Sequence, residues 1–249
     1  NLLRNGKQTA VKLSFNNQQS IELLAGRIAT QIEADSISLL NSMTDEEFLT
    51  KNGFSSKTNL GMYLPNSYEF FWNTSADGFR DRMLKEYNRF WNETRLNKAR
   101  EIGLNPDKVM TLASIVHEES KQRSEQPRIA GVYINRIKNK WPLQADPTLK
   151  FAAYQLPKFR NTVIKRVLNV HKEIDSPYNT YKNLGLPPGL IAMPDISAIE
   201  AVLNYEKHKY FYFAASADKP GYHKFAKTLS QHNQNARDYQ RYLSKQGIT

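Results

Sequence analysis

The stretch that decides the fold of the second half of the chain is NPDKVMTLASIVHEES, residues 105–120. Asn105 can accept a hydrogen bond from the first turn of a helix, Pro106 suits the first helical position, and Asp107 lies beside the positive helix end. An apolar run with helical spacing follows these start signals. The sequence therefore predicts a helix that begins at Pro106 and has one buried face.

Two adjacent glutamates close this stretch, and helical geometry separates them. Neighbouring helix residues point about 100° apart, so Glu118 and Glu119 cannot share a face. Glu119 falls about 20° from Leu112, inside the apolar arc, whereas Glu118 lies about 120° away on the polar side. Glu119 is therefore the candidate functional residue of this helix.

A carboxyl group on an apolar helix face has two interpretations, and the spacing leaves both open. Glu119 can be an ordinary helix-end side chain that turns to solvent or pairs with Arg123 or Arg136. Alternatively, burial raises the pKa of Glu119, so that the group stays protonated near neutral pH and acts as a general acid.

The composition describes a folded protein with a strong positive charge. The chain has 249 residues, of which 40% are hydrophobic and 24% charged, so it is long enough for a proper core. A net charge of +11 attracts nucleic acid, anionic lipid or acidic polymers, although a solvated basic surface without a role is an equal alternative. The sequence has no cysteine, which excludes disulfides and thiolate metal sites. No apolar stretch has the roughly 20 residues of a membrane-spanning helix.

Motifs for several common chemistries are missing from the sequence. No metal-ligand spacing joins the histidines, which are His117, His171, His208, His223 and His232. No P-loop, Rossmann glycine pattern or nucleophile elbow occurs. We therefore expect no metal and no cofactor. Carboxylates are the best candidates for catalytic groups.

Periodicity and capping signals predict the remaining elements. Before the central stretch they give a strand at 11–15, helices at 20–32 and 44–53, a loop-rich segment at 55–78 and one long charged helix from about Asp77 to Gly103. After it they give a helix from Ser124, a strand within 208–216 that turns into 222–226, and a final helix at 228–246.

Two polar segments in the second half are candidates for binding. In PLQADPTLKFA, residues 142–152, the side chains of Gln144, Asp146 and Thr148 alternate with apolar ones. A simpler interpretation is a turn in which Asp146 caps the helix that follows. Residues 175–194 are dense in Gly, Pro, Asn and Tyr, which suits sugar or peptide recognition, although a structural loop is equally compatible.

Seven short motifs occur in the order typical of one family. They are LASIVHEES, GVYINRI, LQADPT, YNTY, GLPPG, YFYFAA and HKFAKTLSQHN. The chain resembles the endolytic murein transglycosylase family, the MltG or YceG-like proteins of the bacterial cell envelope, over roughly residues 56–243. The resemblance implies an α+β fold, with a mixed helical and β-sheet catalytic domain at 56–249. Residues 1–55 would be a partial LysM-like remnant with a connecting segment, and NLLRNGK at its start resembles the tail of that subdomain.

The resemblance also implies a mechanism. In the family the last glutamate of SI-[IV]-x-K-E-[TS] is the catalytic acid, and it aligns with Glu119. The family commonly has lysine where this chain has Glu118, which changes the local charge but leaves the acid in place. The implied reaction cleaves the β-1,4 bond between N-acetylmuramic acid and N-acetylglucosamine without water, as the muramyl C6 hydroxyl closes a 1,6-anhydro ring. No metal or cofactor is needed.

Family motif positions supply the candidates for holding the acetamido sugars, which are Gln144, Asp146, Thr148, Tyr178, Asn179 and Tyr181. Asp146 could alternatively orient Glu119 or serve as a second carboxylate, which would favour hydrolysis. Two other functions remain open: a hydrolytic muramidase, and a non-catalytic module that binds glycan or nucleic acid.

Partners and location follow from the resemblance as expectations. The substrate would be the glycan strands of peptidoglycan, the partners would be peptidoglycan synthases whose nascent strands the enzyme ends, and no nucleic acid would bind. The sequence begins at Asn1 and not at Met. We expect an N-terminal anchor, absent from this sequence, that holds the protein in the cytoplasmic membrane with the catalytic domain outside the cytoplasm.

Overall fold

The small sheet of the first half begins the computed structural model, which describes residues 8–160, 162–164 and 166–247. The predicted LysM-like tail at residues 1–7 lies outside these. Strand β1 (Ala10–Phe15) pairs antiparallel with β2 (Asn66–Phe71), so that Leu13 lies opposite Tyr68. Both side chains are buried. Strand β2 falls in the segment predicted as loop-rich, because only two apolar positions alternate there before consecutive aromatic residues hide the period.

The helices that pack with this sheet begin at side-chain caps. They are α1 (Ile21–Ala29), α2 (Ser36–Met43), α3 (Glu46–Lys51) and α4 (Ala76–Phe90), with a short 3₁₀ helix η1 (Asn59–Met62). The caps that accept backbone hydrogen bonds are Ser20, Asp35, Asp45 and Ser75. The sequence analysis therefore predicts the Ser20 cap correctly and misses α2, although Asp35 is a typical capping residue.

The single long helix predicted from Asp77 to Gly103 is wrong. The structure has α4 and then a separate helix, α5 (Glu93–Glu101). The chain leaves the helical conformation at Trp91, whose ψ is 57°, and the Asn92 side chain accepts a hydrogen bond from the Arg95 backbone N–H at 3.1 Å. Asn92 thus starts a new helix, because its side chain competes with the backbone.

Contacts divide the chain into two compact units. One unit ends at Asn97 and includes Ala192–Ile196, and the other comprises Lys98–Ile191 and the chain from Ser197 onward. The sequence predicts a boundary near residue 55 instead. The pairing of β2 with β1 and the packing of α4 on α2 hold residues 56–97 in the first unit. These long-range contacts have no local signal in the sequence.

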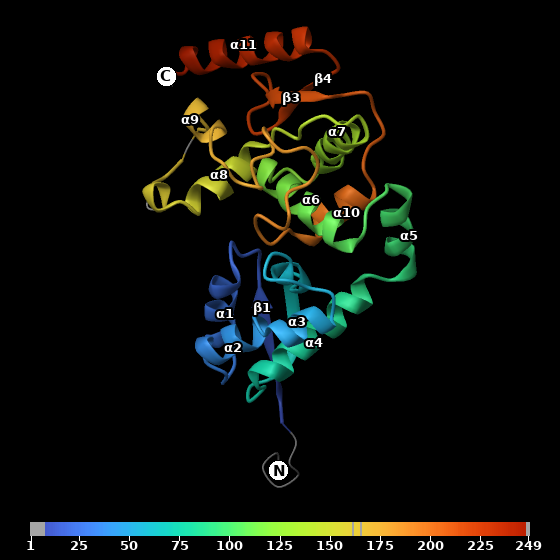
Figure 1. Ribbon diagram of the computed structural model, residues 1–249, viewed down its shortest axis with the longest axis vertical. Coiled ribbons are helices and arrows are strands. Elements are labelled where there is room, and N and C mark those ends of the chain that lie inside the picture. Colours follow the sequence, from blue (N-terminus) through green and yellow to red (C-terminus); the bar gives the residue numbers. More distant parts are fainter. Residues whose placement is uncertain (1–7, 161, 165, 248–249) are drawn as a thin grey trace. The chain divides into compact units, whose positions relative to one another are not determined.

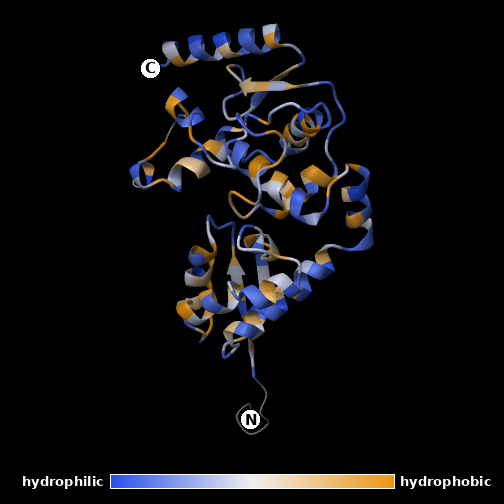
Figure 2. Cartoon of the chain, viewed as in Figure 1, coloured by the Kyte–Doolittle hydropathy of each residue, from blue (hydrophilic) through white to orange (hydrophobic). Residues whose placement is uncertain are grey.

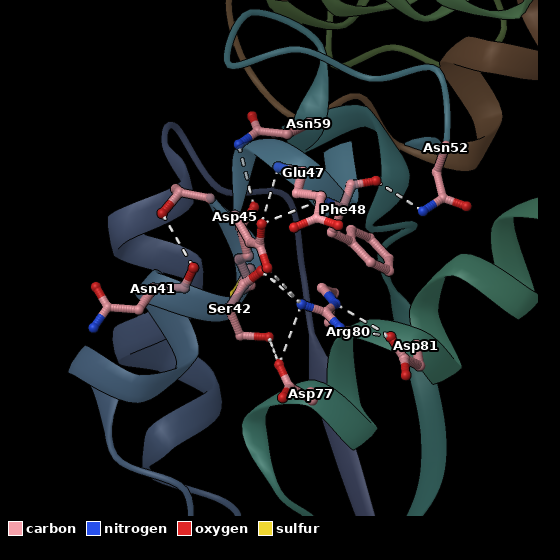
Figure 3. A network of polar contacts seen from close by, with 12 residues as sticks. Asn41, Ser42, Asp45, Glu47, Phe48, Asn52, Asn59, Asp77, Arg80 and Asp81 are labelled. Carbon is pink, nitrogen blue, oxygen red and sulfur yellow. Dashed lines mark hydrogen bonds and ion pairs between the residues drawn. The ribbon is translucent and has the colours of Figure 1, made fainter. Parts of the chain in front are cut away.

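Arg80 joins three helices of the first unit (Figure 3). Its guanidinium lies 3.8 Å from the centroid of the Phe48 ring, and only 11% of its side chain is exposed. Nitrogen–oxygen distances of 3.7, 3.2 and 3.0 Å join it to Asp45, Asp77 and Asp81. The cation is therefore compensated by carboxylates from α4 and from the cap of α3.

Arg80→Ala should lower the free energy of unfolding of the first unit by about 2 to 3 kcal/mol, because it removes the ring contact and leaves three carboxylates close together. Urea denaturation followed by tryptophan fluorescence measures the change. Arg82→Ala is the matched control, since Arg82 is 43% exposed and pairs with Glu86 along one helix. We expect less than about 0.5 kcal/mol for the control, and equal losses for both variants would contradict the prediction.

The second unit is built around helix α6 (Pro106–Glu119), which is buried continuously from Val109 to His117. Asn105 caps it and Pro106 begins it, as predicted. The other elements are α7 (Gln126–Lys138), α8 (Asp146–Tyr154), a 3₁₀ helix η2 (Pro157–Phe159), α9 (Asn169–Lys172), α10 (Ile196–Leu203), β3 (Tyr212–Ala215), β4 (His223–Ala226) and α11 (Leu229–Lys245). Helices α7 and α8 pack on α6, and α11 lies along the hairpin of β3 and β4 (Figure 1).

The described residues of the two units give an α+β protein with two small antiparallel sheets. The segment at 175–194 contains no described helix or strand, in agreement with the sequence. Helix α11 is mainly hydrophilic, with apolar positions interspersed (Figure 2). No helix among the described residues is both long enough and apolar enough to cross a bilayer.

Candidate active site

A pocket of about 340 Å³ in the second unit brings the end of α6 together with five later segments of the chain. Its lining residues are Glu119, Arg136, Gln144, Asp146, Tyr181, Tyr212, Phe213, Leu229 and His232. They combine a carboxyl pair, an amide, a histidine and aromatic rings. Such a lining can hold a polar ring through hydrogen bonds while aromatic faces cover its apolar side.

Glu119 is the last residue of α6, and its side chain is partly buried. The Tyr133 hydroxyl, from α7, donates a hydrogen bond to Glu119 Oε1 at 2.5 Å. Burial raises the pKa of Glu119 to about 7, and the negative charge of Asp146 adds to the rise. The Tyr133 hydrogen bond and the positive charges of Arg136 and Lys150 oppose it. Near neutral pH Glu119 is therefore poised both to give and to take a proton.

The neighbouring Glu118 has a different environment. Its Oε1 lies 3.2 Å from Lys121 Nζ and 3.8 Å from His117 Nε2. It does not line the pocket that Glu119 enters. The helical periodicity therefore identifies correctly which of the two glutamates faces the interior.

The Arg136 side chain lines the pocket, but its guanidinium hydrogen-bonds backbone carbonyl oxygens. Its Nε donates to the Phe211 carbonyl oxygen at 2.8 Å, and a second guanidinium nitrogen donates to the Leu143 carbonyl oxygen. Among the described residues no ion pair joins Glu119 to Arg123 or Arg136. The alternative in which Glu119 is neutralised by a paired arginine is thus wrong.

Three predicted binding residues reach the pocket: Gln144, Asp146 and Tyr181. The Tyr181 hydroxyl donates to Asp146 Oδ1 at 2.6 Å. Asp146 is the first residue of α8 and its carboxylate does not cap the helix, because the cap position is Ala145. Gln144 has a φ of +48°, a costly backbone conformation for a residue with a side chain, which surrounding contacts maintain.

The other three predicted binding residues lie behind the pocket wall. Thr148, Tyr178 and Asn179 are 0%, 6% and 0% exposed, and none lines the pocket. Thr148 Oγ1 donates to the Ala145 carbonyl oxygen at 2.7 Å, and the Asn179 amide donates to the Ile174 carbonyl oxygen at 2.8 Å. Through these bonds Thr148 and Asn179 hold the segments that carry Asp146 and Tyr181. Contact of Thr148, Tyr178 and Asn179 with a sugar stays a prediction.

The sequence misses four side chains of this site. Tyr133 is 1% exposed, yet its hydroxyl reaches Glu119. Tyr212 and Phe213, from β3, line the pocket. The His232 ring stacks on Tyr212 with centroids 5.4 Å apart, and burial lowers the pKa of His232. The one available signal was a tyrosine, with its polar hydroxyl, in the otherwise apolar stretch of α7.

The site thus offers carboxylate acid–base chemistry inside a small pocket with aromatic and amide walls. Within the described ranges no group of three or more His, Cys, Asp or Glu side chains could hold a metal ion. An acid with a pKa near neutrality beside such walls is typical of enzymes that act on glycosidic bonds. The fold and site therefore define an α+β domain with a single poised carboxylic acid.

Comparison with known proteins gives the family. A model of the YceG-like family matches residues 1–238, and the chain belongs to that family. An endolytic murein transglycosylase of Bacillus subtilis is 38% identical over 180 residues, which are 72% of this chain and 47% of that protein. One from Streptococcus pneumoniae strain R6 is 29% identical over 182 residues, 72% of this chain and 32% of that protein. The chain therefore spans about half the length, or less, of these relatives.

A solved structure shares the fold. The crystal structure of a YceG-like protein from Listeria monocytogenes superimposes with a TM-score of 0.73 and 30% sequence identity. The match covers 94% of this chain and 78% of the Listeria chain. The similarity therefore extends over nearly all of the sequence.

Tyr133→Phe should raise the pKa of Glu119 above about 7, because the Tyr133 hydrogen bond stabilises the charged carboxylate and the ring itself stays in place. Carbon-13 NMR titration of carboxyl-labelled glutamate measures this pKa, with Glu119→Gln to assign the signal. Tyr181→Phe is the control, because its hydroxyl bonds Asp146. A pKa that stays constant or falls in Tyr133→Phe would show that the hydrogen bond does not govern the acid.

Glu119→Gln should make the protein more stable at pH 8. The pKa of Glu119 is about 7 in the folded protein and 4.5 in the reference state. The protonated Glu119 carboxyl contributes fully to folding below pH 4.5. This contribution is lost as the pH rises through 7, because the carboxyl then loses its proton and a charge must be buried. We expect the free energy of unfolding to rise by about 1 to 2 kcal/mol in Glu119→Gln at pH 8. The pKa difference alone would give a larger value, and the partial exposure of the group reduces it.

Urea denaturation at pH 8 and at pH 5 tests this stability gain. The gain should shrink toward pH 5, where the wild-type carboxyl is mostly protonated. Glu118→Gln, whose partner is Lys121 near the surface, should show no such trend. A Glu119→Gln variant that is less stable than wild type at pH 8 would contradict the burial of an uncompensated charge.

Proposed function

We propose that the chain carries the catalytic domain of a peptidoglycan lytic transglycosylase. The observation that carries the proposal is the Glu119 carboxyl, which burial poises near neutrality and which Tyr133 orients at 2.5 Å. The relatives named endolytic murein transglycosylase, with 38% and 29% identity, support the same chemistry. One acid suffices when the nucleophile belongs to the substrate.

The proposed reaction uses Glu119 twice. The protonated carboxyl gives its proton to the N-acetylglucosamine O4 as the bond from muramyl C1 to that oxygen breaks. The resulting carboxylate takes the proton of the muramyl C6 hydroxyl as O6 bonds to C1 and closes the 1,6-anhydro ring. The proton returns to Glu119, so atoms and charge balance without water. Gln144, Asp146 and Tyr181 are proposed to contact the acetamido sugars from the pocket wall.

Hydrolysis is the second candidate, and Asp146 is the observation that favours it. This carboxyl lines the same pocket as Glu119 and raises its pKa, so the site has two acids. A hydrolytic muramidase would use the second carboxylate to activate water. In this structure the Tyr181 hydroxyl occupies Asp146 Oδ1 at 2.6 Å, which favours an orienting role for Asp146.

The cellular setting is part of the proposal. The enzyme would work in the bacterial cell envelope, held to the cytoplasmic membrane with this domain outside the cytoplasm. There it would end nascent glycan strands beside the peptidoglycan synthases. The net charge of +11 suits work beside anionic stem peptides and lipid headgroups.

Mass spectrometry of digested peptidoglycan tests the proposed function. Wild-type protein should release fragments with 1,6-anhydro-muramyl ends, each one water lighter than a hydrolytic product. Glu119→Gln should lower their yield by at least about a hundredfold, because the proton donor is lost. Glu118→Gln, a matched change one residue away, should keep the activity. Reducing ends would identify a muramidase, and no cleavage by wild type would leave a glycan-binding module.

A further inference from the structure

A second carboxylate of this unit, Glu125, is buried outside the pocket. It lies at the start of α7 and is 4% exposed. Its Oε1 accepts a hydrogen bond from Ser120 Oγ at 2.6 Å and lies 2.8 Å from His223 Nδ1. Its Oε2 accepts from the His223 backbone N–H at 3.0 Å. Both carboxylate oxygens of Glu125 thus have hydrogen-bond partners, which compensates the cost of burying the group. The contact between Glu125 Oε1 and His223 Nδ1 requires a proton on Nδ1.

The hydrogen bond to Ser120 fixes the end of α6. Ser120 directly follows Glu119, is buried, and closes the helix through its backbone N–H to the Val116 carbonyl oxygen at 3.3 Å. Its own carbonyl oxygen accepts from the Gln126 amide at 2.9 Å. Glu125 therefore restrains the backbone immediately beside Glu119.

A second route leads from Glu125 to the same acid through aromatic rings. The His223 ring packs edge-on against Phe213, with centroids 5.1 Å apart, and Phe213 lines the pocket. Phe213 in turn packs edge-on against Tyr133 at 5.9 Å, and the Tyr133 hydroxyl donates to Glu119. Moving β4 would thus displace the ring that supports the hydrogen-bond donor of Glu119.

We propose that Glu125 and His223 are positioning residues that fix the catalytic carboxyl of Glu119 against the hairpin wall of the pocket. This inference rests on the proposed function. Neither residue lines the pocket, so both act through others: through Ser120 on the backbone of Glu119, and through Phe213 and Tyr133 on its side chain. The pair holds α6 and β4 at a fixed distance from each other. Local sequence preferences do not determine this distance.

Glu125→Gln is the main test, because it keeps the shape and weakens both contacts with His223. On glycan strands kcat should fall by about tenfold or more while KM changes by less than about twofold, since misplacing the acid affects the reacting geometry and not the binding wall. The pKa of Glu119, measured by carbon-13 NMR, should depart from the wild-type value: it falls where solvent reaches the loosened helix end and rises where the Tyr133 hydrogen bond is lost.

Glu206→Gln is the matched control. Glu206 forms an ion pair with Arg128 at 2.9 Å, which also joins α7 to the chain near the hairpin, but both side chains are more than 40% exposed. The control should keep the wild-type kcat and the wild-type pKa of Glu119. If Glu125 and His223 only stabilised the fold, Glu125→Gln would lower stability but keep the kcat and the Glu119 pKa of the control. That result would overturn the proposal.

Two milder variants cover the case in which Glu125→Gln does not fold. Ser120→Ala removes the serine hydroxyl, which contacts Glu125 and the Gln122 backbone N–H, and His223→Gln keeps a polar group opposite Glu125. Each should lower kcat and shift the pKa of Glu119 away from the wild-type value, to a smaller extent than Glu125→Gln. A folded variant with wild-type values overturns the proposal. The NMR pKa needs no turnover. If wild type cleaves no glycan, the proposed function fails while the pKa still decides the positioning role.

Discussion

The rest of the second unit depends on one costly arrangement: a carboxyl group kept at the end of a buried helix with a tyrosine hydroxyl as its partner. Burial disfavours the charge on Glu119, and the hydrogen bond from Tyr133 recovers part of that cost. Burial outweighs the hydrogen bond but is partly offset by it, which leaves the pKa of Glu119 at about 7. A fully solvated carboxyl would be too acidic to hold a proton, and a fully apolar site would hold it too tightly to release it.

Helix α7 keeps that balance because several of its residues tie it to the chain that enters the hairpin. The Asn135 amide donates to the carbonyl oxygens of His208 and Tyr210 at 2.9 and 3.0 Å. Gly131 lets the chain approach, since a Cβ there would lie 2.4 Å from the Glu206 carbonyl oxygen. With Arg136 bonded to the Phe211 carbonyl oxygen, the helix holds the strand that brings aromatic rings to the pocket.

Local rules predict much of this site and stop where tertiary contacts begin. The cap at Asn105 and the 3.6-residue period place Glu119 on the inner face, because both signals lie within one helix. The same rules wrongly predict one continuous charged helix through Asn92, where a side-chain cap divides two helices. Motif positions cannot separate Tyr181, which reaches the pocket, from Asn179, which is buried two residues away. That difference is a matter of packing.

The two acids of the pocket show why environment, and not residue type, assigns their roles. Asp146 is exposed at the first turn of α8, beside the positive helix end, and its Oδ1 accepts a hydrogen bond from the Tyr181 hydroxyl at 2.6 Å. Glu119 lies at the opposite end of a helix, where the dipole offers no help to a negative charge. A fixed negative charge at Asp146 then raises the pKa of Glu119 further. The charge of one carboxyl thus helps the other to hold a proton, so the two acids have different roles in the site.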